Sequence, residues 1–451
     1  MYSRKTLGLQ AAPAEAGSAT TPARTQLFRA ALFVFVISPI ADVALWFIDR
    51  VVTHQDNYYP TAVFMRRWLQ FFASPSLAGN DSWMPMRGAL AWFEQHPGGR
   101  IFEQLFFVEH VKFQYPPSSL LPLHALHSFG IDPTDALLNG IGWFVMLINV
   151  IASGAFAFVL ASRSANHAGL RWHWGIFGGL AALSFFPILM AFRLGQAQVW
   201  INALFALAAL SYVLRRNALT GVLIGLICLC KPQLALFILW GVLRRQWRFC
   251  VGMLVTIAVG GVLSLAVFGL QNHIDYLHVL RELSRTGEAY MPNQSVNGFL
   301  NRLLHTVAEP RVWQAHGFPA FHPIVYAGTL LSSAALIGSA LLLPLRADSK
   351  PGLLDFLIAG LTFTVASPIA WEHHYGIMPA MYLAVMFAIL SFGPSKGKSL
   401  ALAALAASYF VTDHWLGSSW MLCGVLAVLG LMYWTGPFRD KADKQPASAL
   451  R

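Results

Sequence analysis

The sequence predicts an all-α protein that crosses a membrane many times, and both its composition and its pattern lead to that class. Of its 451 residues, 56% are hydrophobic and only 11% are charged, against roughly 25% charged in an ordinary soluble domain. Apolar runs of roughly 20 residues, long enough to cross a bilayer as helices, recur from Leu27 to Phe438. The runs stay apolar instead of alternating, unlike the strands of a membrane β-barrel. We therefore exclude a soluble globular enzyme and expect about 11–13 helices.

The basic residues indicate membrane topology and not a nucleic-acid partner. The formal net charge is +11, but Arg and Lys cluster at the ends of apolar runs, as at Arg215-Arg216 and Arg244-Arg245. Cytoplasmic loops of membrane proteins carry such an excess. Basic residues also precede the first run, at Arg4, Lys5 and Arg24, and follow the last, at Arg439, Lys441 and Lys444. We therefore expect both termini in the cytoplasm and no nucleic acid among the partners.

The N-terminal part is predicted to consist of a tail, a membrane anchor and a large outside loop. Residues 1–24 are a polar stretch, expected to be a disordered cytoplasmic tail, and they lack the apolar core of a signal peptide. The first run, Leu27–Ile48, should therefore remain as an anchor. The first outside loop, 49–116, contains two amphipathic stretches, Tyr58–Phe72 and Arg87–Phe107, which would lie flat on the membrane surface.

The rest of the chain completes one predicted membrane domain, residues 25–438, ahead of a cytoplasmic tail at 439–451. Between 118 and 243, the apolar pieces cannot all be single crossings if the basic loops there are cytoplasmic. One resolution makes 218–243 a short hairpin with Lys231-Pro232 at its tip and leaves 118–131 non-spanning. Further crossings then flank a second outside loop at 271–322, and we expect them at 249–270, 323–345, 354–371, 376–393, 399–412 and 415–436.

Two ionisable residues lie in apolar surroundings, where a charge is costly and normally has a reason. Asp42 is the only charged residue between Arg29 and Asp49, and either a helix–helix hydrogen bond or a functional role fits it. Lys231 interrupts an apolar run and precedes a proline that breaks the helix. A lysine beside freed backbone N–H groups is a candidate phosphate ligand, and a lysine snorkelling to the interface is the alternative.

A second group of candidates lies at helix breaks and turns. Ser367-Pro368 is followed by Glu372, His373 and His374, which present a carboxylate and two imidazoles at a broken helix end. Three such ligands are few for zinc, so we expect hydrogen bonds to substrate hydroxyls or phosphate, or simple helix capping. The turn at Gly195-Gln196 is a weak signal by itself. The amides of 293–298 could bind sugar hydroxyls or only form a turn.

The cysteines predict neither a disulfide framework nor a zinc site. All four lie in or beside apolar segments, and the single Cys-x-Cys pair has no partner cluster. They are Cys228, Cys230, Cys250 and Cys423.

Several short stretches occur in a recognisable order over most of the chain from residue 80 to residue 380. They are Arg100–Glu103, Phe113–Pro117, Leu194–Gln196, Leu219–Gly225 with Lys231-Pro232, Leu243–Arg248, and Ser367–His374. In this order the chain resembles glycosyltransferase family 87, the polyprenol-phosphate-sugar-dependent mannosyltransferases of bacterial envelopes.

The resemblance implies a GT-C membrane fold and a transferase of the bacterial inner membrane with its active site on the outer face. A sugar, mannose or another hexose, would pass from a polyprenyl-phosphate donor to an envelope glycolipid or glycan acceptor. An Asp of the first outside loop would take the proton of the attacking hydroxyl, while cations and N–H groups hold the leaving lipid phosphate. No metal and no other cofactor is expected.

Two aspartates compete for the role of base, because two features of the family separate in this chain. In relatives the acid follows soon after the first span and also precedes a Gly-rich stretch at a set distance. Asp56 satisfies the first criterion, and Asp81, ahead of Gly98–Phe102, satisfies the second. We prefer Asp81, treat residues 50–78 as an insertion, and keep Asp56 as the rival.

The resemblance also carries over residues that would bind the donor phosphate or sugar, with one of them, a tyrosine, forming part of the pocket wall. These are Lys231, Gln196, Tyr115, Glu372, His373 and His374.

A transporter or flippase of lipid-linked saccharides is the main alternative from another functional class. It would carry charged residues through several spans near the midplane. The predicted spans 249–270, 323–345 and 415–436 have none of these, and the polar residues gather in the two outside loops. The pattern therefore favours the enzyme.

Overall fold

The computed structural model of the chain describes residues 20–52, 54, 59–314, 317–346, 352–414, 416–417 and 419–436. Every regular element within these ranges is a helix, and extended pairing is limited to one isolated bridge between Asn293 and Trp371. The predicted all-α class is confirmed.

The described helices include four that are long and apolar enough to cross a membrane, or five if one bent pair counts as a single span. The four are Pro22–Val52, Asp135–Arg163, Trp247–Thr286 and Pro323–Pro344. The bent pair joins Ala168–Ser184 to Phe186–Arg193 at an angle of 49°. Shorter apolar helices of 10–17 residues accompany them, and the expected 11–13 helices counted such short segments as crossings. The chain is a polytopic membrane protein, as predicted.

The N-terminal half contains helices long enough to cross a membrane together with several shorter ones. Its helices are α1 (Thr20–Leu32), α2 (Ser38–Phe47), α3 (Thr61–Leu69), α4 (Trp83–Gln95), α5 (Leu121–Ser128), α6 (Asp135–Arg163), α7 (Arg171–Ser184), α8 (Phe186–Arg193) and α9 (Gln198–Val213). Short turns of tighter or wider helix join them: η1 (Phe33–Ile37), η2 (Ile48–Val52), η3 (Pro75–Leu77), η4 (Glu103–Val108), η5 (Pro117–Leu120) and η6 (Ala168–Leu170).

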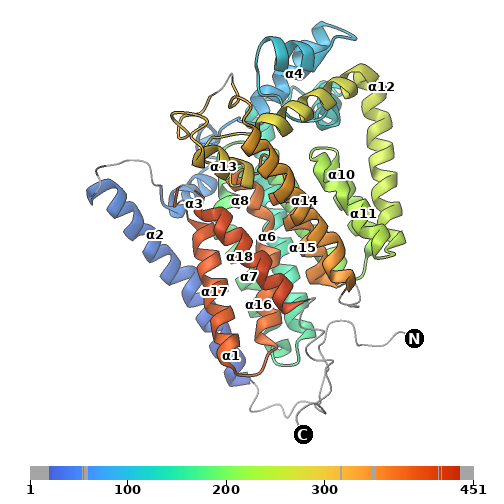
Figure 1. Cartoon of the computed structure of the whole chain (residues 1–451). Coiled ribbons are helices and arrows are strands. Elements are labelled where there is room, and N and C mark those ends of the chain that lie inside the picture. The colour runs from blue at the N-terminus through green and yellow to red at the C-terminus, as the bar shows by residue number, and fades with distance from the viewer. Residues whose placement is uncertain are drawn as a thin grey trace.

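The C-terminal half continues the bundle with α10 (Asn217–Cys228), α11 (Leu236–Leu243), α12 (Trp247–Thr286), α13 (Val296–Leu303), α14 (Pro323–Arg346), α15 (Leu353–Val365), α16 (Pro379–Leu390), α17 (Lys396–Asp413) and α18 (Trp420–Thr435). Two short turns, η7 (Pro232–Ala235) and η8 (Glu372–Ile377), follow breaks in the helices. Figure 1 shows α4, α13 and the second part of α12 gathered at one end of the bundle.

The uncertain region between 118 and 243 has the arrangement of the proposed hairpin. α10 and α11 are short helices, and the chain turns between them at Lys231 and Pro232. At the other end of the hairpin, the Asn217 side chain donates a 2.7 Å hydrogen bond to the side chain of Gln246. The piece at 118–131 holds only η5 and the eight-residue α5. Eight residues span about 12 Å as a helix, too short to cross a bilayer, so this piece is non-spanning.

Two predicted boundaries differ from the helix limits in the structure. α1 begins at Thr20, so the last five residues of the expected tail at 1–24 are helical, and the tail at 439–451 lies outside the described residues. The second outside loop does not begin as a loop at 271, because α12 continues to Thr286. α12 bends at Gly269, whose φ of 73° and ψ of 160° are accessible to glycine because it lacks a Cβ.

The core that holds the α10–α11 hairpin is aromatic. The Phe356 ring of α15 lies 5.2 Å from Phe237 and 5.8 Å from Trp240, both of α11, and 4.7 Å from Tyr212 of α9. Such pairs add to the free energy gained by burying apolar area. The hairpin is therefore packed firmly against the rest of the bundle.

Asp42 has a structural partner in the fold. Its carboxylate accepts a 2.7 Å hydrogen bond from the backbone N–H of Thr61, the first residue of α3, and it is 3% exposed. An acceptor at a helix N-terminus pairs one of the N–H groups that lack intrahelical partners. Of the two interpretations left open for Asp42, the contact supports the structural one.

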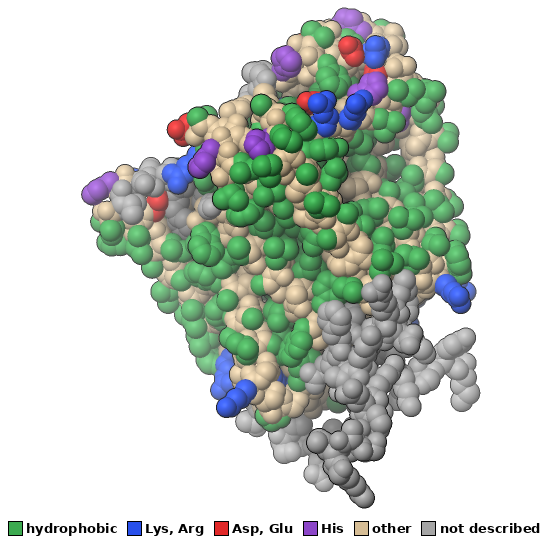
Figure 2. Space-filling model, viewed as in Figure 1, with side chains coloured by type: hydrophobic (Ala, Val, Ile, Leu, Met, Phe, Trp, Pro, Cys, Tyr) green, Lys and Arg blue, Asp and Glu red, His purple; other side chains and the backbone are tan. Residues whose placement is uncertain are grey.

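The surface is consistent with a membrane protein. On the face seen in Figure 2, a broad band of hydrophobic side chains covers the middle of the molecule. Acidic residues, histidines and some Lys and Arg appear above the band, and further Lys and Arg appear at its lower edge. Contiguous apolar surface of this extent is typical of contact with lipid.

Candidate active site

Asp81 lies on a loop that is fixed to a second loop far along the chain. Between residues 79–82 and 193–195, backbone N–H groups of Gly79, Asp81 and Ser82 donate to the carbonyls of Arg193, Leu194 and Gly195 at 2.7, 2.8 and 3.1 Å. The approach depends on glycine: a Cβ on Gly195, whose φ is +66°, would lie 2.1 Å from the Gly79 carbonyl oxygen. The turn at Gly195-Gln196, a weak signal in the sequence, therefore belongs to the loop that holds the Asp81 loop in place.

Side chains complete the attachment. Gln196 donates a short hydrogen bond through Nε2 to the Asp81 carboxylate. Its Oε1 accepts from Ser82 Oγ at 2.6 Å and from the Tyr115 hydroxyl at 3.1 Å. Because both bonds to Oε1 fix the amide orientation, the Gln196 N–H group is held toward Asp81. Gln196 is itself 3% exposed.

The electrostatic setting of Asp81 is suited to a base. Asp81 is exposed and lines the cavity, yet the protein around it removes part of its hydration, and this desolvation raises the pKa of Asp81 above its ordinary value. The hydrogen bond from Gln196 acts in the opposite direction and lowers it. A carboxylate with a raised pKa accepts a proton more readily than an ordinary one.

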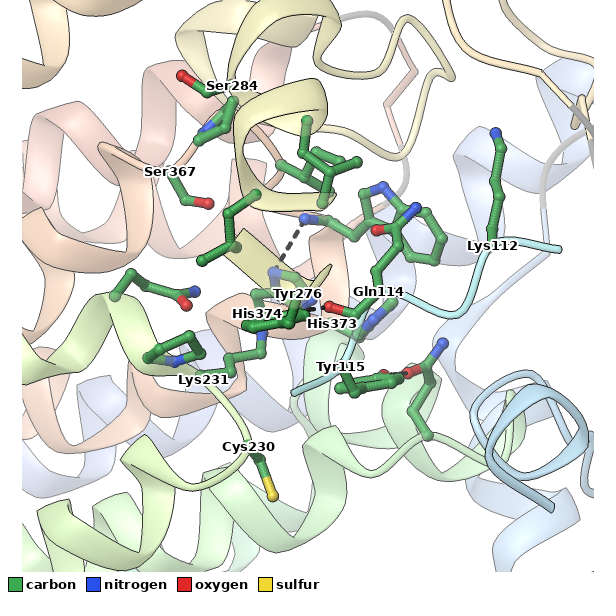
Figure 3. A pocket seen from close by; sticks show the side chains of 18 of the residues that line it. Lys112, Gln114, Tyr115, Cys230, Lys231, Tyr276, Ser284, Ser367, His373 and His374 are labelled. Atoms are coloured by element: carbon green, nitrogen blue, oxygen red, sulfur yellow. Dashed lines mark hydrogen bonds between the residues drawn. The ribbon is translucent and has the colours of Figure 1, made fainter. Parts of the chain in front are cut away.

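Asp81 lies at the edge of a cavity of about 640 Å³, which we call the first cavity. It contains most of the residues predicted as a site, drawn from separate parts of the chain: Asp81, Tyr115, Gln196, Lys231, His373 and His374. Figure 3 shows the Lys231 side chain extending toward the two imidazoles, with Tyr115 and Gln114 nearby.

The polar groups of the first cavity have free capacity for a ligand. Lys231 Nζ is buried and has no hydrogen-bond partner among the described residues, and neither does either ring nitrogen of His373. Burial and the nearby Lys231 charge hold the pKa of His373 and of His374 well below the ordinary value, so both imidazoles are neutral. Burial also lowers the pKa of Lys231 well below its ordinary value, so a bound anion would favour the charged form of the amine. A lysine with neutral imidazole donors is a set that binds a phosphate or sugar hydroxyls.

Apolar side chains form much of the remaining wall of the first cavity. They come from α11, α12, α14 and α15 and are Leu236, Leu280, Leu283, Ile337 and Phe363. Such a wall suits the hydrocarbon part of a lipid whose polar end reaches Lys231.

A second cavity, of about 720 Å³, lies against the first and shares part of its wall. The shared residues are Asp81, Met84, Trp313, Trp371 and His373. η8 separates the two spaces, because His374 lines only the first cavity and Glu372 lines only the second. Asp81 is therefore a carboxylate that reaches both.

Glu372 is placed apart from the other predicted ligands. It is 4% exposed, and its Oε2 has no hydrogen-bond partner among the described residues. Burial raises the pKa of Glu372 to about 8, although Arg193 acts to lower it. At neutral pH the group is therefore mostly protonated and available as a hydrogen-bond donor.

The rival aspartate, Asp56, lies outside the described residues.

The 293–298 turn has a structural role. The Asn293 side chain donates to the carbonyls of Glu288 and Pro368 and accepts from the N–H of Ala370. These bonds hold the segment that leads into η8, so the interpretation as a turn fits Asn293 better than sugar binding does.

Sequence reasoning missed several residues of the two cavities. Lys112 is paired with Glu288 at 2.8 Å, and its Nζ lies 3.9 Å above the centre of the Trp313 ring. Arg67 of α3 lines the second cavity. Lys112 comes directly before the recognised Phe113–Pro117 stretch, which was the available signal. Arg67 had none, because an arginine on an amphipathic helix is normally solvated.

No group of three or more His, Cys, Asp or Glu in the described part of the chain is arranged to hold a metal ion. The described cysteines are free, and three of the four are not exposed.

Comparisons with known proteins place the chain among related sequences. The model of glycosyltransferase family 87 matches residues 113–368. A polyprenol-phosphate-mannose-dependent alpha-(1-2)-phosphatidylinositol mannoside mannosyltransferase of Mycobacterium tuberculosis is 26% identical over 338 residues, covering 73% of this chain and 74% of that protein. The protein of the same description from Mycolicibacterium smegmatis is 25% identical over 345 residues, covering 73% of each. No solved structure gives a significant match.

Proposed function

The chain belongs to glycosyltransferase family 87 and is a membrane glycosyltransferase, and from this premise we propose which substrates it uses. The donor is a polyprenyl-phosphate sugar, mannose or another hexose. The acceptor is a hydroxyl of an envelope glycolipid or glycan on the outer face of the bacterial inner membrane. The donor class rests on the names of the two relatives and on the first cavity, where Lys231 lies at the end of an apolar wall.

The proposal rests mainly on the observation that Asp81 and Lys231 line the same cavity. In the proposed step the acceptor oxygen attacks the anomeric carbon of the donor sugar while its proton passes to the Asp81 carboxylate. The bond from that carbon to the phosphate oxygen breaks, and its electron pair stays on the polyprenyl phosphate. Lys231 stabilises the added negative charge, since a cation in a water-poor site acts strongly on developing charge.

The remaining residues position these two groups. Gln196 orients the Asp81 carboxylate, and Tyr115 and Ser82 orient Gln196. The neutral His373 and His374 donate to sugar hydroxyls or phosphate oxygens. No metal ion enters the proposal, because Lys231 supplies the charge that the leaving phosphate needs.

The charge pattern supports the proposed orientation in the membrane. Arg215, Arg216, Arg244 and Arg245 lie at one end of the α10–α11 hairpin, and Lys231 lies at the other. The excess of Lys and Arg on cytoplasmic loops therefore supports an active site that opens toward the outer face, with both termini in the cytoplasm.

The function is tested with the full-length protein in membrane vesicles supplied with radiolabelled polyprenyl-phosphate mannose, polyprenyl-phosphate glucose, and a lipid extract from the producing bacterium. We expect label in a new glycolipid or glycan from one of the donors, and transfer that persists in the presence of a chelator. Label that crosses the membrane while still linked to polyprenyl phosphate, without any new product, would instead support the flippase.

A further inference from the structure

The second cavity provides a place for the other substrate of the proposed reaction. We infer that it binds the acceptor and that Arg67 and Arg193 select an acceptor carrying a phosphate or a similar anion close to the reacting hydroxyl. The inference rests on the proposed function and adds the class of acceptor to it.

The position of the cavity supports this assignment. A transfer between two substrates requires the acceptor hydroxyl and the donor sugar to meet at the base. Asp81 lines both cavities, whereas Lys231 and the apolar wall of α11, α14 and α15 belong to the first alone. If the first cavity holds the donor, the acceptor reaches Asp81 from the second.

The charge of the second cavity indicates an anion. The guanidinium carbons of Arg67 and Arg193 lie 6.0 and 5.7 Å from the centre of the buried Phe64 ring. Neither arginine forms an ion pair with a carboxylate among the described residues, and Arg193 Nε is buried without a hydrogen-bond partner. Burial and the Arg67 charge both lower the pKa of Arg193, and a ligand of opposite charge would offset both effects.

Glu372 does not supply that charge. It lies in the same cavity, but it forms no ion pair with Arg193, and burial raises its pKa to about 8. Glu372 interacts electrostatically with Arg193, but at pH 7 its mostly protonated carboxyl offsets little of the positive charge and can itself donate a hydrogen bond. Arginine is also the side chain best shaped to bind phosphate oxygens in pairs.

The rest of the lining suits a glycan beside the anion. Tyr59, Asn80 and Tyr290 contribute hydroxyl and amide groups, and Trp313 and Trp371 contribute aromatic surface. Hydroxyl and amide groups that converge on a cavity fix the orientation of a polar ligand. We therefore expect a sugar ring near Asp81 and its phosphate near the two arginines.

The test compares three acceptors with the purified full-length protein and labelled polyprenyl-phosphate sugar. Octyl α-mannoside is neutral, mannosyl phosphatidylinositol is an anionic lipid, and its deacylated form carries the same phosphate without the lipid. We expect the KM of both anionic acceptors to be about tenfold or more below that of the neutral one, since a charge-assisted hydrogen bond contributes roughly this factor. A low KM for the lipid form alone would contradict the role of the phosphate.

The arginine variants make the test specific. Arg67→Gln and Arg193→Gln should each reduce the preference for the anionic acceptors to about one- to threefold, and Arg67→Lys should retain part of it. Arg66→Gln is the matched control, because Arg66 is the exposed neighbour of Arg67 and bonds only Gln70 among the described residues. An anionic preference that survives both Gln variants would overturn the inference while leaving the glycosyltransferase function standing. Wild-type protein that transfers sugar to none of the acceptors, nor to the bacterial lipid extract, would contradict the proposed function itself.

Discussion

The reactivity of Asp81 depends on two opposing influences that act on a single carboxylate. Desolvation raises its pKa, and the hydrogen bond from Gln196 lowers it. Gln196 can act in this way only because Ser82 and Tyr115 occupy its carbonyl oxygen. A base on this loop is therefore tuned by the neighbouring loop at 193–196.

This balance predicts a pH profile. Catalysis requires the deprotonated carboxylate, so turnover should fall as pH decreases through the raised pKa of Asp81, at a higher pH than for an ordinary aspartate. Gln196→Leu removes an interaction that favours the charged form, so the acidic limb of kcat should move further toward neutral pH. Gln104→Leu, on the surface beside Glu109, serves as the control. An acidic limb that stays in place, or moves to lower pH, in Gln196→Leu would contradict the assignment.

The break between α10 and η7 has a function that the helices alone do not explain. Pro232 cannot continue the helix, and the break leaves Lys231 at the tip of the hairpin with a buried, unpartnered Nζ. η8 is a comparable break, and it divides Glu372 from His374 between the two cavities. At both breaks, polar side chains project into a cavity from a turn instead of from the side of a continuous helix.

The hairpin predicts a donor-specific effect. Lys231→Met should raise the KM for the polyprenyl-phosphate donor about tenfold or more and lower kcat, because it removes the charge that faces the phosphate. Lys396→Met, at an exposed position, is the control. Donor kinetics that match wild type in Lys231→Met would assign Lys231 to snorkelling.

The sequence could predict the helical class and the hairpin, because both follow from apolar runs and a proline. It could also nominate Lys231, Gln196 and His373 one by one. It could not show that Gln196 touches Asp81, since the two are 115 positions apart and the contact depends on Gly79 and Gly195.

Some site residues were beyond the reach of sequence patterns for a physical reason. Glu372 and His374 are two positions apart and looked equivalent, yet the turn at η8 directs them to different cavities. Arg67 resembles any solvated arginine on a surface helix until α3 is packed against α8. Such assignments depend on tertiary packing, which a local pattern does not encode.

At the scale of the whole molecule, one buried ion pair joins three helices near the end of the hairpin opposite Lys231. Arg244 bonds both carboxylate oxygens of Asp355 at 2.9 Å and the carbonyls of Ala340 and Leu341 at 2.9 and 2.7 Å. Both side chains of the pair are less than 10% exposed. The pair connects the end of α11 with α14 and α15, three helices whose residues line the first cavity.

Removing one member of this pair should destabilise the protein strongly. Arg244→Met leaves the Asp355 charge buried without a partner, at a cost of about 3–5 kcal/mol. The double variant Arg244→Met with Asp355→Leu should recover most of that loss, while Arg248→Met at an exposed position should have little effect. Thermal unfolding in detergent measures all of these, and a double variant no more stable than Arg244→Met would contradict the account.

The most direct test of the central claim compares the two aspartates in the donor-dependent transfer assay. Asp81→Asn and Asp56→Asn are assayed beside Asp132→Asn, an exposed control outside both cavities, with donor binding measured separately. We predict that Asp81→Asn loses transfer by roughly 10²–10⁴-fold, the usual contribution of a general base, and still binds the donor, while Asp56→Asn stays within about threefold of wild type. Transfer near the wild-type rate in Asp81→Asn, or its loss in Asp56→Asn alone, would contradict Asp81 as the base.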